Sequence, residues 1–363
     1  MGYKSKLMML AAISVAAGAC GATSSSTTTT SAKSKFVGCL VTDTGGINDR
    51  SFNASAWAGM QQAAAQGHFA IRYLQSPSSS DYASNIADFV AQKCGIIVTV
   101  GFDMGPATQA AAIAHPKQKF AIVDFGFSKQ YPNVDTLQYQ TNQDGFLGGY
   151  LAAAMSKSGV VGTFGGLDIP TVTIYMDGFV AGVRYYDLKN HAHVKALGWV
   201  PAAHRAAGSF AGTGLFTGSF TNENDGKLAA NSLMQQGADV IFPVAGPVGL
   251  GAAAAVQQAN NGTVMEWVDT DGCVSAPQYC PIFLTSVTKG ITVSVKGAAL
   301  AAANGTFRGG SYTGTLANGG VALAPFHDFS SKVPAGLKAT LAQLKAGIIA
   351  GKISVDPNSY PAS

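Results

Sequence analysis

Short apolar stretches alternate with longer stretches of helical character along most of the chain. The apolar stretches are rich in Val, Ile and Phe, and the longer ones are rich in Ala with apolar residues at helical spacing. Continuous apolar strands separated by helices indicate parallel sheets covered on both faces, so the predicted fold class is α/β. The predicted strands are 35–43, 69–76, 95–102, 120–127, 160–168, 196–200, 239–246 and 263–270, and the predicted helices are 51–67, 81–93, 105–116, 144–158, 175–190, 226–237 and 249–262.

The alternation restarts with a strand and helix of its own after about residue 143, which predicts two similar lobes. The chain has 363 residues, more than the ~100–200 residues typical of one domain. We expect the N-terminal lobe to contain residues 36–143 and 272–322. The C-terminal lobe is then expected to contain residues 144–271 and 323–363.

Polar residues and glycines follow many of the predicted strands. In doubly wound sheets, ligands bind at the carboxyl ends of the strands, where the strand order reverses. A turn or a helix cap is the simpler explanation for any single one of these residues. Several strands that end in this way favour a ligand-binding cleft between the lobes. The residues are Asp43, Phe102, Asp103, Asp124, Asp168, Gly246, Asp269 and Asp271.

The first twenty residues have the pattern of a secretory signal. Lys4 and Lys6 precede an apolar segment and a small-residue run that ends in Ala-Gly-Ala-Cys. The apolar segment is too short to cross the ~30 Å core of a bilayer. The run before Cys20 resembles a bacterial lipobox, so residues 1–20 are predicted to be a lipoprotein signal peptide, with plain secretion as the alternative. We expect a lipid on Cys20 to hold the exported protein at the outer face of the cytoplasmic membrane.

Residues 21–35 are predicted to form a flexible tether between that anchor and the folded body. They are rich in Ser and Thr, and such a tract cannot bury enough apolar surface to become ordered.

Four cysteines remain once Cys20 is set aside. An even number in an exported protein favours disulfides. Cys273 and Cys280 enclose a short loop, and Cys39 and Cys94 lie at strands that we expect to be neighbours. These two pairings are therefore predicted, and four unpaired buried cysteines are the alternative. The spacing of the cysteines and histidines does not suggest a zinc site.

Composition and motifs exclude several classes of function. Apolar residues make up 47% of the chain and charged residues 12%, and the formal charge of +4 falls to about +2 without Lys4 and Lys6. No basic run suggests nucleic acid as a partner. The usual loops of dinucleotide-binding enzymes, P-loop proteins and α/β-hydrolases are missing from the sequence. No cofactor is expected.

The stretch 43–49, DTGGIND, resembles the calcium loop of nucleoside hydrolases in part. Gly45 and Asn48 stand where that loop needs aspartates, so a catalytic metal site is disfavoured. We expect neither a metal nor an enzymatic activity, and an exported nucleoside hydrolase remains the enzyme alternative.

A set of motifs in order along the chain resembles the basic membrane protein family. The motifs are TDTGGINDRSFNASAWAGMQQA, VGF, FAIVD, GFLGGYLAA, GGLDIP, GFVAGVRY, GADVIFPVAGPVG, VDTDG and LTSVTKG, and they run from about residue 36 to 355. The resemblance implies a type I periplasmic-binding fold, with two Rossmann-like lobes joined by three crossovers. It also implies a lipoprotein that delivers a purine nucleoside to the permease and ATPase subunits of an ABC transporter. We expect such a receptor to be a monomer.

The resemblance further implies roles for individual residues. Phe52 and Phe220 would hold the base between two rings, and the carboxylate of Asp124 would choose among bases. The ribose hydroxyls would be held by Asp43, Asp269 and Lys289, because carboxylates accept from a diol and an ammonium donates to it. Gly246 would let the backbone approach the ligand. Further candidates for ligand contact are Asn48, Asp49, Tyr175 and Asp271. A sugar receptor of the same fold is the alternative within this class.

Overall fold

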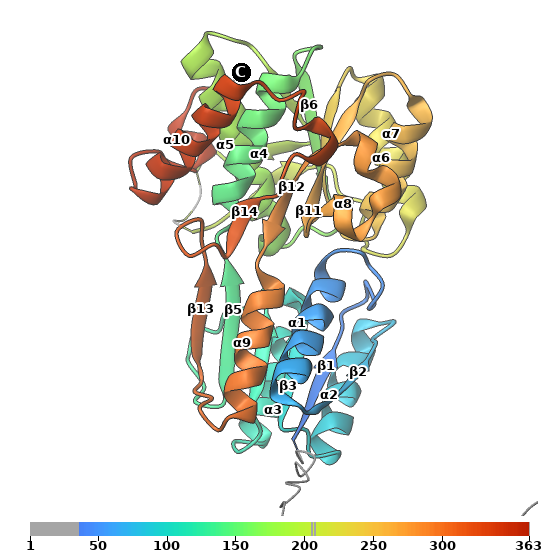
Figure 1. The fold of residues 1–363 in the computed structure, drawn as a ribbon, viewed down its shortest axis with the longest axis vertical. Helices are drawn as coiled ribbons and strands as arrows, with labels where there is room; N and C mark the ends of the chain where they lie inside the picture. The colour runs from blue at the N-terminus through green and yellow to red at the C-terminus, as the bar shows by residue number, and fades with distance from the viewer. Residues whose placement is uncertain (1–35, 205, 207, 363) are drawn as a thin grey trace, which may run out of the picture. The chain divides into compact units, whose positions relative to one another are not determined.

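The computed structural model describes residues 36–204, 206 and 208–362. The predicted signal peptide with Cys20, and the predicted tether 21–35, lie outside the described residues. Within the described part, the strands form two six-stranded sheets and one two-stranded sheet. Each large sheet has its own helices, so the body consists of two α/β lobes (Figure 1).

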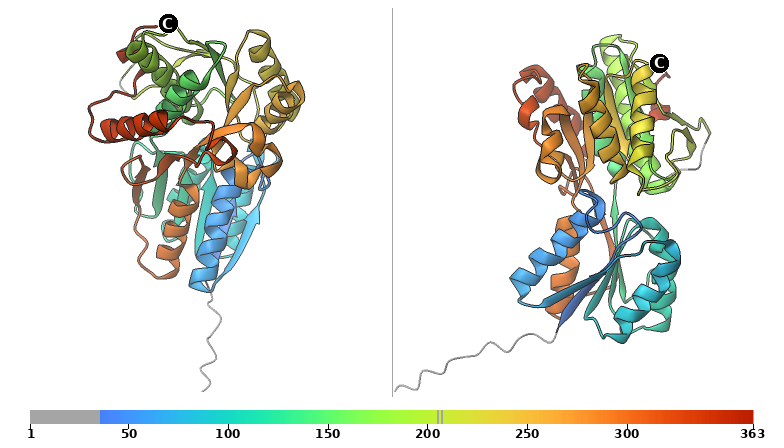
Figure 2. Two further views of the ribbon diagram at one scale, coloured as in Figure 1. Left: turned by 45° about the horizontal axis from the view of Figure 1, so that its top comes forward. Right: turned by 90° about the vertical axis from the view of Figure 1, so that its right-hand side faces the viewer.

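The first lobe is built on a parallel sheet with the strand order β13-β5-β4-β3-β1-β2. Helices α1 and α9 pack together on one face, and α2 and α3 cover the other (Figure 2). Strands β3 and β4 are buried at every position, because helices cover both of their faces. The elements are β1 Val37–Val41, α1 Phe52–Gly67, β2 Ala70–Leu74, α2 Tyr82–Ala91, β3 Ile96–Val100, α3 Gly105–Ala114, β4 Phe120–Val123, β5 Val134–Tyr139, α9 Ile291–Ala303 and β13 Gly310–Gly314.

The second lobe is built on a sheet with the order β14-β12-β11-β10-β6-β7, in which β14 is antiparallel to β12. Strands β8 and β9 form the separate two-stranded sheet. The elements are α4 Thr141–Met155, β6 Val160–Gly165, α5 Pro170–Asn190, β7 Lys195–Leu197, β8 Trp199–Pro201, β9 Gly212–Gly214, α6 Glu223–Gln235, β10 Val240–Val244, α7 Val248–Ala259, β11 Val264–Asp269, α8 Gly272–Ser275, β12 Phe283–Lys289, β14 Val321–Leu323 and α10 Ala335–Ile349.

Glycines bring helices α4 and α5 into close contact. A Cβ atom on Gly149 would lie 1.9 Å from the carbonyl oxygen of Phe179, and one on Gly182 would lie 2.0 Å from that of Phe146. No larger residue fits at either position without moving the backbone. Helix α4 begins beside the first crossover, so this rigid helix pair fixes where the second lobe starts.

The described chain passes between the two sheets three times, as the family resemblance implied. The passages follow β5, β12 and β13. Hydrogen bonds join the three passages. The backbone N–H of Gln140 donates to the carbonyl of Gly314 at 2.9 Å, and that of Gly290 donates to the carbonyl of Gly320 at 2.8 Å. The predicted type I periplasmic-binding architecture is therefore present.

The predicted division of the chain between the lobes is wrong for residues 272–289. Strand β12 was expected in the N-terminal lobe, but it pairs in parallel with β11 in the second sheet. The chain returns to the first lobe only at Gly290, where α9 begins. The error arose because the return was placed after β11, and β12 was not recognised as one more parallel strand of the same sheet.

Two disulfides join the cysteines in the predicted pairs. Cys39 is bonded to Cys94 inside the first lobe, where both are buried, and Cys273 is bonded to Cys280 in the connection between β11 and β12. In the second pair both cysteines are partly exposed.

Candidate functional site

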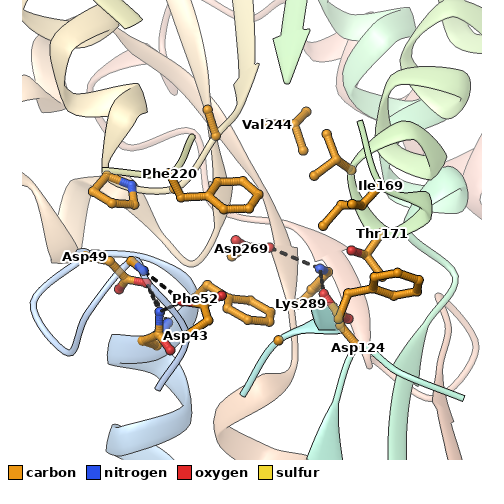
Figure 3. A pocket seen from close by; sticks show the side chains of 18 of the residues that line it. Asp43, Asp49, Phe52, Asp124, Ile169, Thr171, Phe220, Val244, Asp269 and Lys289 are labelled. Atoms are coloured by element: carbon orange, nitrogen blue, oxygen red, sulfur yellow. Dashed lines mark hydrogen bonds and ion pairs between the residues drawn. The ribbon is translucent and has the colours of Figure 1, made fainter. Parts of the chain in front are cut away.

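A pocket with about 510 Å³ of empty space lies where the carboxyl ends of the two sheets meet (Figure 3). In each sheet, three strands bring residues to it from the positions at or just after their ends. Helix α1 and the first turn of α5 complete the walls. The lining residues are Asp43, Gly45, Asp49, Phe52, Asn53, Gly101, Phe102, Asp124, Ile169, Thr171, Val172, Tyr175, Phe220, Val244, Ala245, Gly246, Pro247, Asp269 and Lys289.

A buried cation between two carboxylates forms one end of the pocket. The ammonium of Lys289, the last residue of β12, lies 2.5 Å from an oxygen of Asp124 and 3.5 Å from one of Asp269. The three residues are at most 8% exposed. Burial alone would lower the pKa of Lys289, but the two carboxylates raise it above its ordinary value, so the lysine stays charged.

The backbone at the two carboxylates is unusual for residues with a side chain. Asp124 and Asp269 both have φ of 66°, in the left-handed region that few residues other than glycine, asparagine and aspartate adopt. Each follows or ends a strand, so the turn at that point aims the carboxylate along the sheet edge into the pocket. The hydroxyls of Ser51 and Tyr175 donate to Asp269 at 3.1 and 3.2 Å and hold its orientation.

The opposite end of the pocket holds a carboxylate with no cation. One oxygen of Asp43 accepts from the backbone N–H of Gly45 at 2.9 Å and from the side-chain amide of Asn53 at 2.7 Å. Burial raises the pKa of Asp43 to about 6, against the opposing effect of these two hydrogen bonds. This end therefore has an acidic group that changes charge near neutral pH.

Asp49 fixes the start of helix α1 next to Asp43. Its carboxylate accepts from the backbone N–H groups of Ser51, Asn53 and Ala54, which would otherwise be the unpaired donors of a helix N-terminus. Burial raises the pKa of Asp49 to about 7. Because its oxygens are engaged by the helix, Asp49 serves mainly to place the neighbouring Phe52 and Asn53.

Two half-buried phenylalanine rings lie between these ends. Phe52 is the first residue of α1 in the first lobe, and Phe220 belongs to the loop before α6 in the second lobe. Figure 3 shows both rings pointing into the pocket, one above the other with space between them. Phe220 needs a glycine behind it, since a Cβ on Gly166 would lie 2.3 Å from the ring. The ammonium of Lys289 lies 5.1 Å from the centre of the Phe52 ring.

The remaining wall is largely apolar and includes exposed backbone. Val244, Ala245 and Val172 line it, and Gly246 follows β10 with φ of 52°. A Cβ on Gly246 would meet no atom within 4 Å, so steric crowding does not require glycine here. The positive φ favours glycine, and the missing side chain leaves the backbone open to a ligand.

Nine of the eleven residues proposed from sequence line this pocket, and two do not. Asn48 is exposed on the loop before α1. Asp271 accepts from the backbone N–H of Cys273 at 3.1 Å and lies 2.7 Å from the ring of His327, so it caps α8 instead. The proposed residues in the pocket are Asp43, Asp49, Phe52, Asp124, Tyr175, Phe220, Gly246, Asp269 and Lys289.

Sequence reasoning missed several pocket residues. Asn53 directly follows Phe52, and only its contact with Asp43 reveals its role. Ile169, Thr171 and Val172 follow the GGLD strand end, a position that could have suggested them. Their side chains enter the pocket because α5 begins there.

Asp271, Cys273 and His327 are the one group of possible metal-ligating side chains found among the described residues. The sulfur of Cys273 is bonded to Cys280, which leaves only Asp271 and His327 as donors. None of the described helices has the length and apolar character needed to cross a membrane.

Two lobes with a pocket where the carboxyl ends of their sheets meet are the architecture of the type I periplasmic-binding class of folds. A solute-binding protein of Aeropyrum pernix K1 has the same fold, with a TM-score of 0.78 and 23% identity over 88% of this chain and 92% of that one.

Sequence comparison gives the family. The model for the PnrA-like ABC transporter substrate-binding proteins matches residues 36–202 and 215–354. A nucleoside-binding protein of Lactococcus lactis subsp. cremoris, named BmpA, is 31% identical over 365 residues, which cover 95% of this chain and 96% of the relative. An uncharacterized lipoprotein of Pyrococcus horikoshii is 30% identical over 88% of this chain and 76% of the relative. The chain belongs to the basic membrane protein (Bmp), PnrA-like, family of ABC transporter substrate-binding proteins.

Proposed function

We propose that this substrate-binding protein captures a purine nucleoside for uptake. The observation that carries the proposal is the pair of rings, Phe52 and Phe220, placed between two polar ends of different chemistry. Stacking of a base on aromatic rings contributes ~1–3 kcal/mol per base and accepts any base. The nucleoside-binding relative from Lactococcus lactis supports the same class of ligand.

In the proposed complex the ribose lies at the Lys289 end. An ammonium flanked by the carboxylates of Asp124 and Asp269 offers a donor and two acceptors within a few ångströms, which suits a vicinal diol. The base then lies between the rings with its edge toward Asp43, whose carboxylate can accept a ring N–H. Asn53 lies beside Asp43, and its buried side-chain oxygen has no hydrogen-bond partner within the part of the chain that the structure describes.

This arrangement exchanges two roles expected from the sequence. Asp124 was expected to choose the base and Asp43 to hold the ribose. The ion pair of Asp124 with Lys289 favours the ribose for that end, because an acceptor already committed to a cation discriminates poorly between bases. Among the described residues no cation pairs with Asp43 and only one of its oxygens accepts hydrogen bonds, so the other is available to accept an N–H of a base.

We further propose that the protein works as a monomer tethered by a lipid on Cys20, and that it delivers its ligand to the permease and ATPase subunits of an ABC transporter. The support is the lipobox-like sequence before Cys20, the family membership and the relative named a lipoprotein. Replacing Cys20 with Ser should release the protein from membranes, and unchanged membrane retention would contradict the anchor.

The ligand can be tested directly. The purified protein is examined by mass spectrometry for a carried ligand, and its thermal unfolding is followed with inosine, guanosine, adenosine, uridine, ribose and glucose. Purine nucleosides should raise the melting temperature and should be recovered intact. Stabilisation by free sugars and not by nucleosides would favour the sugar receptor, and release of free base would favour a hydrolase.

A further inference from the structure

The two disulfides of this protein differ in what can reach them. Cys39 and Cys94 are 0% and 4% exposed, whereas Cys273 and Cys280 are both partly exposed on the second lobe. Thiol–disulfide exchange needs an attacking thiolate to reach a sulfur atom. A dissolved dithiol can therefore reduce Cys273–Cys280 in the folded protein while Cys39–Cys94 stays protected.

The accessible disulfide closes the connection between two strands that deliver charges to the pocket. Strand β11 ends at Asp269, and β12 ends at Lys289. Between them the chain forms α8, which has only four residues, and the bond from Cys273 to Cys280 ties this short helix to the segment that leads into β12. A helix of that length is not stable by itself, so it depends on such ties.

Several other contacts also hold the start of this loop: Gly272 and Ala276 are buried, and the carboxylate of Asp271 lies 2.7 Å from the ring of His327. The backbone N–H of Gly272 donates to the hydroxyl of Ser286 at 2.9 Å, and the carboxylate of Asp271 accepts from the N–H of Cys273 at 3.1 Å. Val274 is 74% exposed and contributes little packing. To these contacts the disulfide adds a covalent constraint on the backbone between Asp269 and β12.

Residues of the first lobe contact the end of β11 and the loop that follows it. The hydroxyl of Ser51 contacts the carbonyl of Val268 at 3.0 Å and the carboxylate of Asp269 at 3.1 Å. The guanidinium of Arg50 donates to the carbonyl of Ser275 at 3.3 Å. Ser51 immediately precedes Phe52, so its contact joins one of the pocket rings to the end of β11, and the neighbouring Arg50 makes the contact with the loop that the disulfide closes.

We propose that the Cys273–Cys280 disulfide positions the loop that holds the closed pocket, so that its reduction speeds ligand release without unfolding the protein. Reduction by a dithiol breaks the S–S bond, transfers two electrons and two protons to form two thiols, and leaves the dithiol as a disulfide. Cys273, Cys280 and Arg50 are positioning residues, since none of them lines the pocket. The proposal rests on substrate binding in this pocket, with a nucleoside as the proposed ligand.

The test compares the two disulfides in matched variants. Cys273→Ala with Cys280→Ala should increase the dissociation rate of inosine by about two- to tenfold, the change expected from losing one or two hydrogen bonds of the closed state. Cys39→Ala with Cys94→Ala should lower the melting temperature and leave that rate unchanged. Dithiothreitol should speed release from the wild type and from the Cys39–Cys94 variant, and reoxidation should restore slow release.

Arg50 provides a second, independent readout. Arg50→Met should speed release in the oxidised protein but add little to the Cys273–Cys280 variant, because both changes remove the same contact with Ser275. Additive effects of the two changes, or an unchanged rate in the Cys273–Cys280 variant, would overturn the proposal.

Amide hydrogen exchange tests the role of the disulfide without any ligand, and so independently of the proposed function. In ligand-free protein, removal of the Cys273–Cys280 bond should speed amide exchange in residues 270–282 and leave the first lobe unchanged. If inosine does not bind the wild type, the proposed ligand is wrong, and the exchange measurement still decides whether the disulfide holds this loop. Unchanged exchange there would contradict the positioning role for any ligand.

Discussion

The two ends of the pocket are both acidic, but they handle charge in different ways. At one end Lys289 lies between Asp124 and Asp269, so a permanent cation neutralises part of the negative charge. At the other end, within the described part of the chain, Asp43 accepts hydrogen bonds from Gly45 and Asn53 and pairs with no cation, and burial raises its pKa to about 6. Burial raises the pKa of Asp124 as well, but there the ammonium of Lys289 opposes this effect, whereas at Asp43 only hydrogen bonds from described residues oppose it.

This difference separates affinity from selectivity. Buried groups that an ion pair already orients cost little reorganisation when a ligand's hydroxyls replace water, so the Lys289 end is suited to hold the part that all nucleosides share. A lone carboxylate rejects a ligand that offers it no donor, because its buried oxygen would then be unpaired. The Asp43 end is therefore suited to choose among bases.

The largest effect is expected from removing the cation. Lys289→Met would leave Asp124 and Asp269 buried without their partner, and breaking a buried ion pair from one side costs about 3–5 kcal/mol. We expect a lower free energy of unfolding and at least a hundredfold loss of nucleoside affinity, measured by denaturant titration and by calorimetry. Lys345→Met, at an exposed lysine on α10, is the control and should change neither quantity.

The rings come next in expected effect. Phe52→Ala or Phe220→Ala should weaken every accepted nucleoside by about 1–3 kcal/mol, or roughly tenfold to a hundredfold, because stacking does not depend on the base. Phe36→Ala, which removes a ring that packs on Phe69 outside the pocket, should leave affinity unchanged. A loss confined to one base would show that the rings do not act as a general stacking pair.

The prediction that decides which end holds which part of the ligand uses isosteric changes and modified nucleosides. Asp124→Asn should reduce the preference for inosine over 2′-deoxyinosine and 3′-deoxyinosine, because the ribose hydroxyls lose their carboxylate. Asp43→Asn should reduce the preference for inosine over 1-methylinosine, whose ring lacks that N–H. Each change in preference should be about tenfold, within the ~1–3 kcal/mol cost of an unpaired buried group.

The opposite pattern would reverse the assignment of the ends. If Asp124→Asn altered the discrimination between bases and Asp43→Asn that between riboses, the roles first expected from the sequence would hold. Both results come from competition calorimetry against inosine, and wild-type protein serves as the reference in each case.

Much of this pocket could be predicted from sequence because its residues sit at strand ends. Asp124, Asp269 and Lys289 each end or follow a buried strand, and parallel strands bring such positions to one edge. What the sequence could not reveal was the partner of each group. Lys289 and Asp124 are 165 residues apart and come from different sheets, so their ion pair depends on how the lobes close.

The wrong predictions have equally local causes. Asp271 follows a strand as Asp269 does, but two residues further on the chain has turned into α8, and the carboxylate caps that helix. Asn48 lies on a loop whose direction is set by Asp49 and its bonds to α1. In both cases short-range hydrogen bonds of a neighbouring or capping carboxylate, which no strand pattern encodes, accompany the turn of the chain away from the pocket.

The smallest expected effect concerns pH, and it tests whether Asp43 is the group that distinguishes the two ends. The carboxylate accepts a base N–H only when ionised, and with a pKa of about 6 the ionised fraction falls as the pH drops from 7 to 5.5. Inosine affinity should fall about fourfold over this range, as follows from a single titration with that pKa. Asp43→Asn should remove this dependence, whereas Asp124→Asn should keep it and move its midpoint to lower pH, because the charge of Asp124 raises the pKa of Asp43.

The stability of the ligand-free protein should change in the opposite direction. Burial raises the folded-state pKa of Asp43 from 3.8 to about 6, and that of Asp49 to about 7. The folded state therefore holds these protons more tightly than the unfolded chain, so their contribution to stability is complete below about pH 4 and is lost as the pH rises through 6 and 7. Between pH 5.5 and 7 the melting temperature of the empty protein should fall while the rise produced by inosine grows.

Asp103 and Asp124 also raise the pKa of Asp43, so Asp103→Asn, outside the pocket, should move the midpoint of the affinity change to lower pH. If inosine affinity in the wild type did not change with pH, the carboxylate of Asp43 would not be the acceptor of the base N–H.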